Sequence, residues 1–110
     1  MKEKIKFIYL DEHTLEGDSA FPTYGTQLDL KRYGITFEEG KRYWFWHDSG
    51  ADYKGQDNPV LFTGVAHFNN ERDGWFVVID EGSGQYYSES EFKDDYTIED
   101  IVGPSINEHK

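Results

Sequence analysis

Apolar and polar residues alternate most regularly in the middle of the chain, between Lys41 and Asp80. The stretch Lys41–Asp48 alternates with a period of two, which is typical of a β-strand. Its two faces carry Arg42, Trp44 and Trp46 on one side, and Tyr43, Phe45 and His47 on the other. Because both faces are rich in aromatic residues, the pattern predicts a central strand that is covered on both sides.

Two further β-branched and aromatic runs, 60–69 and 74–80, lie on either side of the polar segment Asn70-Glu71-Arg72-Asp73. Two such runs separated by a short turn are typical of a β-hairpin. Gly74 follows the turn segment and accepts a positive φ, so we expect it to complete the turn. Pro59 stands where a strand can begin, after an exposed loop expected over 49–58.

The N-terminal stretch 4–10 also alternates, with lysines on one side and apolar residues on the other. This pattern predicts an edge strand whose lysines discourage further strand pairing. The expected inner residues are Ile5, Phe7 and Tyr9, and the expected outer residues are Lys4 and Lys6. An irregular loop is expected over 11–25, with Phe21 and Tyr24 as plugs of the core.

The rest of the chain gives shorter signals. Residues 26–33 are compatible with either a short strand or one helical turn. Residues 85–88 predict a short strand, and 97–102 one helical turn with Thr97 as the N-cap. Gly103-Pro104 ends that turn, and we expect a loose tail over 103–110.

These elements predict one mainly β domain over residues 1–110, with its β-core at 35–88. We expect a small, strongly bent SH3-like barrel or a compact sandwich, with about five or six short strands and one or two single-turn helices. The order of these elements resembles an SH3-like barrel. It begins with the segment Gly34-Ile35-Thr36-Phe37-Glu38-Glu39-Gly40 and continues with an aromatic strand, an acidic loop, a hairpin, a short strand and a helical turn. This resemblance covers about Leu30 to Val102 and implies architecture, not function.

Charge adds a constraint on partners, because 22 acidic and 11 basic residues give a formal net charge of −11. Such a surface repels nucleic acid and anionic membrane, attracts a basic protein and speeds encounter with it. The alternative is that the acidity only keeps the protein soluble. The apolar stretch at residues 7–10 is too short for a signal sequence, so we expect a cytoplasmic protein. The sequence indicates no oligomeric state.

Catalytic and metal-binding chemistry finds little support in the sequence. The chain has no cysteine, which excludes disulfides, thiolate nucleophiles and iron–sulfur clusters. His47 and His67 belong to no compact metal-binding motif, and residues 48–58 depart from the calcium-loop pattern. We therefore expect no cofactor and no metal. A small hydrolase or metal-dependent enzyme is the least favoured hypothesis, and it predicts loss of activity in His47→Ala or His67→Ala.

The chain has more aromatic residues than a core of this size easily holds. Either some of these rings are exposed, or residues 4–10 and 21–24 cover them. If some are exposed, two further hypotheses follow. The first is a non-catalytic acidic protein that occludes a basic protein partner, of the immunity-protein or inhibitor type. The second is an SH3-like adaptor that binds a peptide in an aromatic groove formed by Trp44, Trp46 or Tyr53. The candidate partner-binding residues are Trp44, Trp46, Asp48, Asp52, Tyr53, Asp57, Glu81, Tyr86 and Glu89.

Overall fold

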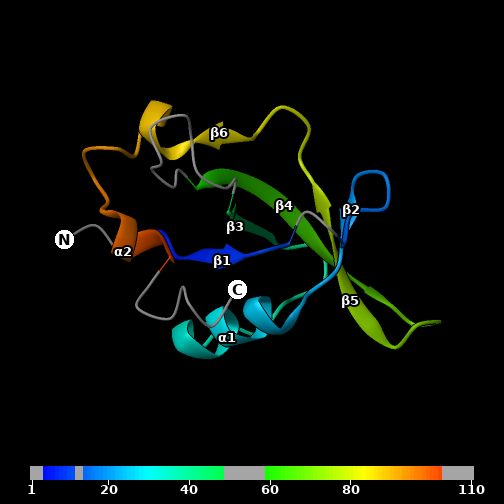
Figure 1. The fold of residues 1–110 in the computed structure, drawn as a ribbon. Coiled ribbons are helices and arrows are strands. Elements are labelled where there is room, and N and C mark those ends of the chain that lie inside the picture. Colours follow the sequence, from blue (N-terminus) through cyan, green and yellow to red (C-terminus); the bar gives the residue numbers. More distant parts are fainter. Residues whose placement is uncertain (1–3, 12–13, 49–58, 103–110) are drawn as a thin grey trace.

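The computed structural model describes residues 4–11, 14–48 and 59–102, which form one sheet with two short helices (Figure 1). The loop expected over 49–58 and the tail expected over 103–110 lie outside these residues. The elements are β1 (Phe7–Tyr9), β2 (Ser19–Ala20), α1 (Tyr24–Tyr33), β3 (Arg42–His47), β4 (Val60–Asn69), β5 (Gly74–Ile79), β6 (Gln85–Tyr86), the 3-10 turn η2 (Tyr87–Glu89) and α2 (Ile98–Val102).

The six strands of the described residues form one mixed sheet in the order β1-β3-β4-β5-β2, with β6 also paired to β4. β1 runs parallel to β3, and the other pairs are antiparallel. The long β4 pairs with β3 and β6 at its start and with β5 at its end. The mainly β class is confirmed. The described strand pairings leave the sheet open between β1 and β2, so the SH3-like barrel is not confirmed.

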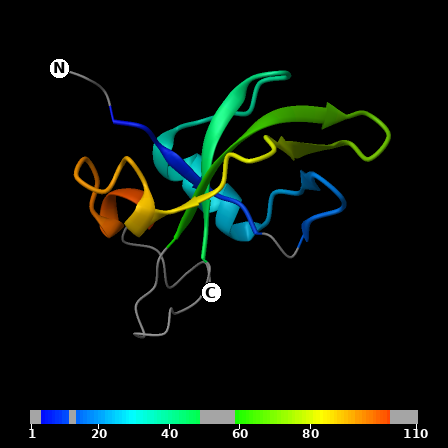
Figure 2. The ribbon, with the colours of Figure 1, turned by 90° about the horizontal axis from the view of Figure 1, so that it is seen from above.

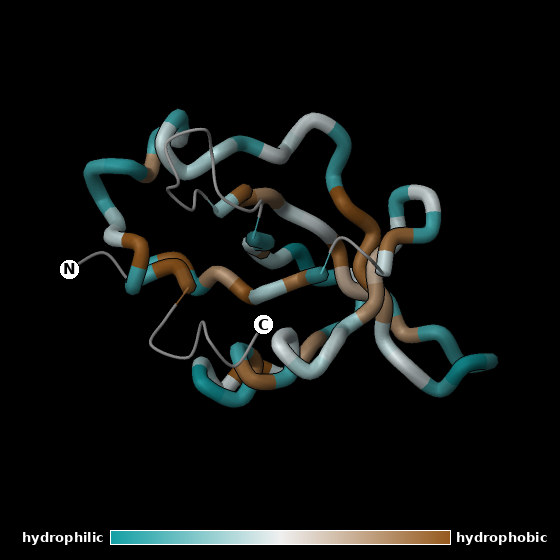
Figure 3. The backbone as a smooth tube through the Cα atoms, in the orientation of Figure 1, coloured by the Kyte–Doolittle hydropathy of each residue, from teal (hydrophilic) through white to brown (hydrophobic). Residues whose placement is uncertain are grey.

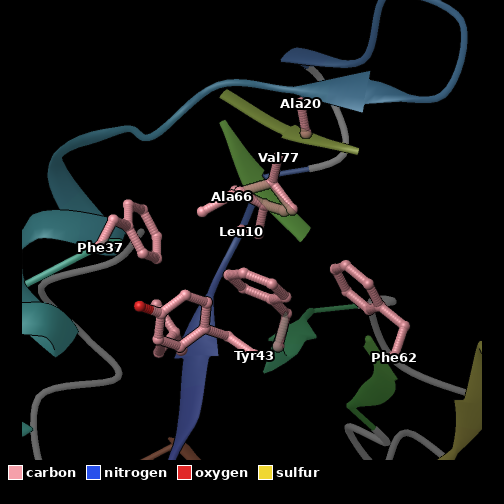
Figure 4. Packing of buried hydrophobic residues seen from close by; sticks show 9 residues of the cluster. Leu10, Ala20, Phe37, Tyr43, Phe62, Ala66 and Val77 are labelled. Atoms are coloured by element: carbon pink, nitrogen blue, oxygen red, sulfur yellow. The ribbon is translucent and has the colours of Figure 1, made fainter. Parts of the chain in front are cut away.

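β3 lies between β1 and β4, which confirms the predicted central strand. The side chains on its two faces pack into two different hydrophobic cores. Tyr43 and Phe45 face the first core, where the Phe45 ring stacks on Phe62 at a centroid distance of 5.7 Å. Figure 4 shows this core, whose buried members are Ile8, Leu10, Ala20, Phe37, Tyr43, Phe45, Phe62, Ala66 and Val77.

The opposite face of β3 carries Trp44 and Trp46 into the second core. Its buried members come from β1, β3, β4 and the C-terminal segment: Phe7, Tyr9, Trp46, Leu61, Phe92, Tyr96, Ile101 and Val102. The rings of Trp44 and Trp46 are thus packed against residues of β1 and of the segment 92–102. The expected cover from residues 21–24 is wrong for Tyr24, which begins α1 and is 68% exposed.

β1 is an edge strand, as predicted, but it is buried on both faces. Phe7 and Tyr9 face the second core, whereas Ile8 faces the first. Its outer edge is blocked by side chains: the Tyr9 N–H donates to Oδ2 of Asp29 at 2.9 Å, and the Ile5 N–H donates to the Tyr96 hydroxyl at 2.7 Å. These bonds satisfy backbone donors that would otherwise offer an edge for pairing with another chain.

α1 is longer than the expected single turn, because its ends are capped. The Thr23 N–H donates to Oγ1 of Thr26 at 3.1 Å at the start of the helix. Gly34 ends the helix in the left-handed conformation, with a φ of 66°. The Ile35 N–H donates a hydrogen bond to the Leu30 carbonyl at 2.8 Å. This glycine stop is a common way to end a helix.

The β4–β5 hairpin confirms the prediction, with Asn69 paired to Gly74. The residue with positive φ in the turn is Asp73, at 51°, which corrects the expectation for Gly74. Oδ1 of Asn69 accepts the backbone N–H groups of Glu71 and Arg72 at 2.9 and 3.2 Å and so fixes the turn. The hydrophilic hairpin tip projects away from α2, at the opposite end of the molecule (Figures 2 and 3).

α2 confirms the predicted turn near residues 97–102. Oγ1 of Thr97 accepts the Asp100 N–H at 3.2 Å, and Oδ2 of Asp100 accepts the Thr97 N–H at 2.9 Å. This reciprocal pair is a capping box. Neither of the two helices in the described ranges has the length and the apolar character that a membrane crossing requires.

Candidate functional site

A groove of about 390 Å³ lies between the segment around Gly17, His47 at the end of β3 and the turn after β5, and we call it the acidic groove. Its floor is apolar and is formed mainly by Leu10, Ala20, Phe62 and Ile79. Its rim carries four carboxylates, from Asp11, Asp18, Asp80 and Glu81. No lysine or arginine is found among the described residues that line it. The groove therefore combines apolar surface with negative charge.

The Asp18 side of the rim is fixed by a tight turn before β2. Glu16 and Ser19 exchange two backbone hydrogen bonds, of 2.8 and 3.1 Å, around Gly17, whose φ is 66°. The Ile79 N–H then donates to the Asp18 carbonyl at 2.8 Å and ties this turn to the end of β5. The exposed Asp18 carboxylate is thus held by backbone bonds that do not depend on its own side chain.

The adjacent part of the rim is the turn that follows β5. Ser83 closes it, because its N–H and its hydroxyl donate to the Asp80 carbonyl at 3.2 and 2.7 Å. Gly82 takes a φ of 77° at the bend. Glu81 is exposed on this turn. The two turns place Asp18 and Glu81 close to Ile79, on adjacent parts of the rim.

The charge of Asp80 is already compensated by its neighbours. Nε and one terminal nitrogen of Arg42 donate to its two carboxylate oxygens at 2.7 and 3.1 Å, and the Thr63 hydroxyl donates at 2.7 Å. The hydrogen bond from Arg42, followed by that from Thr63, holds the pKa of Asp80 below its ordinary value of 3.8. Asp80 therefore orders the rim more than it attracts a cation.

This ion pair predicts an acid-sensitive contribution to stability. The folded-state pKa of Asp80 is lowered, so its contribution is present above about pH 4 and is lost as the pH falls through the folded value. We expect Asp80→Asn to lower the free energy of unfolding near neutral pH, and the gap to the wild type to narrow below about pH 4. Urea unfolding across this pH range measures the gap. The difference in free energy of unfolding between Arg42→Gln and the wild type should narrow in the same pH range. A difference that does not change with pH would contradict this role of the ion pair.

The two strand histidines do not meet. His47 ends β3 opposite Val60, at the start of β4, and lines the acidic groove. His67 lies near the far end of β4, where its Nδ1 is 2.7 Å from Oε2 of Glu39. Across residues 4–11, 14–48 and 59–102, no group of three or more His, Asp or Glu residues is placed to hold a metal ion.

The structure separates the candidate partner-binding residues that the sequence suggested. Trp46 is only 1% exposed and donates its indole N–H to Asp29 at 3.0 Å, so its ring does not reach the surface. Trp44 is half-buried, with its ring 5.1 Å from that of Phe92. Neither ring lines the acidic groove. Asp52, Tyr53 and Asp57 lie outside the described residues.

Three of the remaining four candidates are exposed. Glu81 lines the acidic groove itself. Tyr86, on β6, is 49% exposed, and Glu89 is exposed at the end of η2. Asp48 is half-buried directly after His47. The structure thus places Glu81, Tyr86 and Glu89 along one segment that begins at the groove.

Sequence reasoning missed Asp11, Asp18 and the exposed Leu15 as groove residues. The available signals were weak: Asp11 follows the apolar end of the first strand, and Asp18 follows a glycine in a turn. Asp18 comes near Glu81 through the pairing of β2 with β5, at Ser19 and Val78, whereas Asp11 follows β1, which pairs with β3. A strand of two residues leaves almost no pattern in a sequence.

Comparison of this chain with protein-family models, with curated proteins and with solved structures finds no match. Its function is therefore argued from the geometry and charge of its own residues.

Proposed function

We propose that this chain is a non-catalytic acidic protein that binds and occludes a basic protein partner, of the immunity-protein or inhibitor type, through the acidic groove. The observation that carries the proposal is the composition of the groove, which has an apolar floor, the exposed carboxylates of Asp18 and Glu81 and, in the part described, no lysine or arginine on its walls. This composition complements a lysine or arginine side chain, which has an apolar stem and a cationic head.

Floor and rim have different tasks in this proposal. Phe62 and Ala20 give a floor that is already fixed by the first core, so little order has to be gained on binding. Asp18 and Glu81 are exposed and supply charge at the mouth. Together with the net charge of −11, they steer a basic partner toward the groove and raise the association rate.

The exposed segment after the groove extends the proposed interface. Tyr86 is accessible and two positions beyond Gly84, which lines the groove. Tyrosine is enriched among the residues that dominate binding energy, because it offers a large ring and a hydroxyl. Glu89 adds a further carboxylate. We propose Glu81, Tyr86 and Glu89 as contacts of the same partner.

The test is a charge reversal at the groove with a control of equal net charge. We expect Asp18→Lys with Glu81→Lys to weaken partner binding by about tenfold or more, because two attractions become repulsions. The control, Glu91→Lys with Asp94→Lys, changes the net charge equally on exposed residues that do not line the groove. Basic proteins retained from source-cell lysate at low and at high salt are identified by mass spectrometry and then titrated as purified partners.

The outcomes separate the groove from general acidity. Loss of one basic partner in the groove variant alone supports the proposal. Equal loss in both variants would show that net charge, and not the groove, retains the partner. Unchanged binding in the groove variant would remove the groove from the interface.

A further inference from the structure

A second groove, of about 470 Å³, lies between α1 and the turn end of the β4–β5 hairpin, and we call it the aromatic groove. Its apolar walls are Phe21, Pro22, Leu30, Phe37 and Trp75. The Trp75 ring is braced by Phe68 at a centroid distance of 5.3 Å and by Phe37 at 6.0 Å. The walls are therefore set by packing, which suits them to receive an apolar group without rearrangement.

The polar residues of the aromatic groove differ in charge from those of the acidic groove. No Asp or Glu is found among its described lining residues, although the chain has 22 acidic residues. Three polar side chains line it instead: Gln27, Asn69 and Arg72. Oδ1 of Asn69 already accepts two backbone N–H groups, which leaves its amide nitrogen as a donor.

Arg72 supplies the only positive charge among the described residues of this groove. Its guanidinium carbon lies 5.4 Å from the centroid of the Phe21 ring, an arrangement that favours a cation over an aromatic face. No carboxylate of the described chain is within ion-pair distance of this guanidinium, although Glu71 and Asp73 are its neighbours in sequence. Its donors therefore remain for a group that comes from outside.

We propose that the aromatic groove binds a peptide segment in which a large apolar or aromatic side chain stands next to a carboxylate. The apolar side chain occupies the space against Trp75 and Phe37, and the carboxylate accepts hydrogen bonds from Arg72. A planar guanidinium matches a carboxylate with two parallel hydrogen bonds. This site is separate from the acidic groove, and its ligand carries the opposite charge from the partner proposed there.

The experiment uses two short peptides, one with Phe-Glu at its centre and one with Phe-Gln. Binding is followed by the chemical shifts of the Trp75 indole and the Arg72 side chain in NMR titrations at about 0.15 M salt, where long-range repulsion is screened. We expect the Phe-Glu peptide to bind about threefold to fivefold more tightly, the preference that one exposed ion pair gives.

Arg72→Gln tests the role of the cation without disturbing the apolar walls. We expect it to bind both peptides equally, whereas Lys93→Gln, which removes an exposed cation outside this groove, should keep the preference. Spectra of both variants report that the hairpin stays folded. Equal affinity of the wild type for both peptides, absence of shifts at Trp75, or a retained preference in Arg72→Gln would overturn the proposal. Tighter binding of a proline-rich peptide without a carboxylate than of the Phe-Glu peptide to the aromatic groove would also overturn the proposal.

Discussion

Replacing Asp29 by alanine is expected to lower the free energy of unfolding by about 3 kcal/mol. Asp29 lies on α1 with no exposed surface, and its Oδ2 accepts the Tyr9 N–H at 2.9 Å and the Trp46 indole N–H at 3.0 Å. One carboxylate oxygen thus joins helix α1 to strands β1 and β3. Alanine leaves two buried donors without this acceptor, and each unsatisfied buried donor costs about 1–3 kcal/mol.

Urea unfolding followed by circular dichroism measures this loss, with Gln27→Ala as the control at an exposed position of the same helix. Asp29→Asn keeps an acceptor oxygen and should lose less than the alanine variant. Trp46→Phe removes one donor, so its effect and that of Asp29→Ala should not add in the double variant. Full additivity, or a loss below about 1 kcal/mol in Asp29→Ala, would refute a role for this carboxylate in holding the two elements together.

Gly64→Ala is expected to destabilise the protein by about 2 kcal/mol or more, although alanine is normally the better strand residue. Gly64 pairs with Tyr43 on β3 and with Ile79 on β5, so neighbouring strands enclose it on both sides. A Cβ atom here would lie 2.6 Å from Cγ1 of Val77 and 2.9 Å from the Val78 carbonyl oxygen. Val77 is fully buried, so neither its side chain nor the backbone has room to move away.

Gly74→Ala is the matched control for this overlap, because Gly74 belongs to the same hairpin and its Cβ would meet only the Arg72 carbonyl, at 3.8 Å. Its free energy of unfolding should change little or rise. Thermal and urea unfolding of the two variants compare them directly. If both glycine variants had the same stability, the close approach of β4 and β5 at Gly64 would not be the cause.

The sequence was sufficient for elements whose signal is local. The aromatic alternation of residues 42–47 and the two runs around Asn70–Asp73 predicted β3 and the hairpin, because period and turn residues lie side by side in the chain. Helix α1 was harder to predict, because one of its fully buried side chains is that of the acidic residue Asp29, and because Leu28 and Leu30 also fit a strand. The capping residues Thr23 and Gly34 were the signals that indicate its true extent.

The candidate sites were less predictable than the fold, because they depend on contacts between distant segments. Glu81 was identified by its charge, but Asp18 becomes its neighbour only through the short β2–β5 pairing, and Asp11 is positioned by the pairing of β1 with β3. Trp46 remained a candidate for partner binding because alternation alone does not tell which rings a second core covers. Residues 92–102, which supply much of that core's cover, carry no strand pattern that indicates where they dock.

The parallel pairing of β1 with β3 has a consequence for the order of folding. Phe7, Ile8 and Tyr9 find their partners in Trp44, Phe45 and Trp46, and α1 lies between the two strands in the chain. During synthesis this apolar strand is made first, yet it has no partner in the sheet until β3 has left the ribosome. The β4–β5 hairpin closes over a short turn and needs no such delay. We therefore expect the N-terminal strand to dock late, onto a sheet that the central strands have already begun.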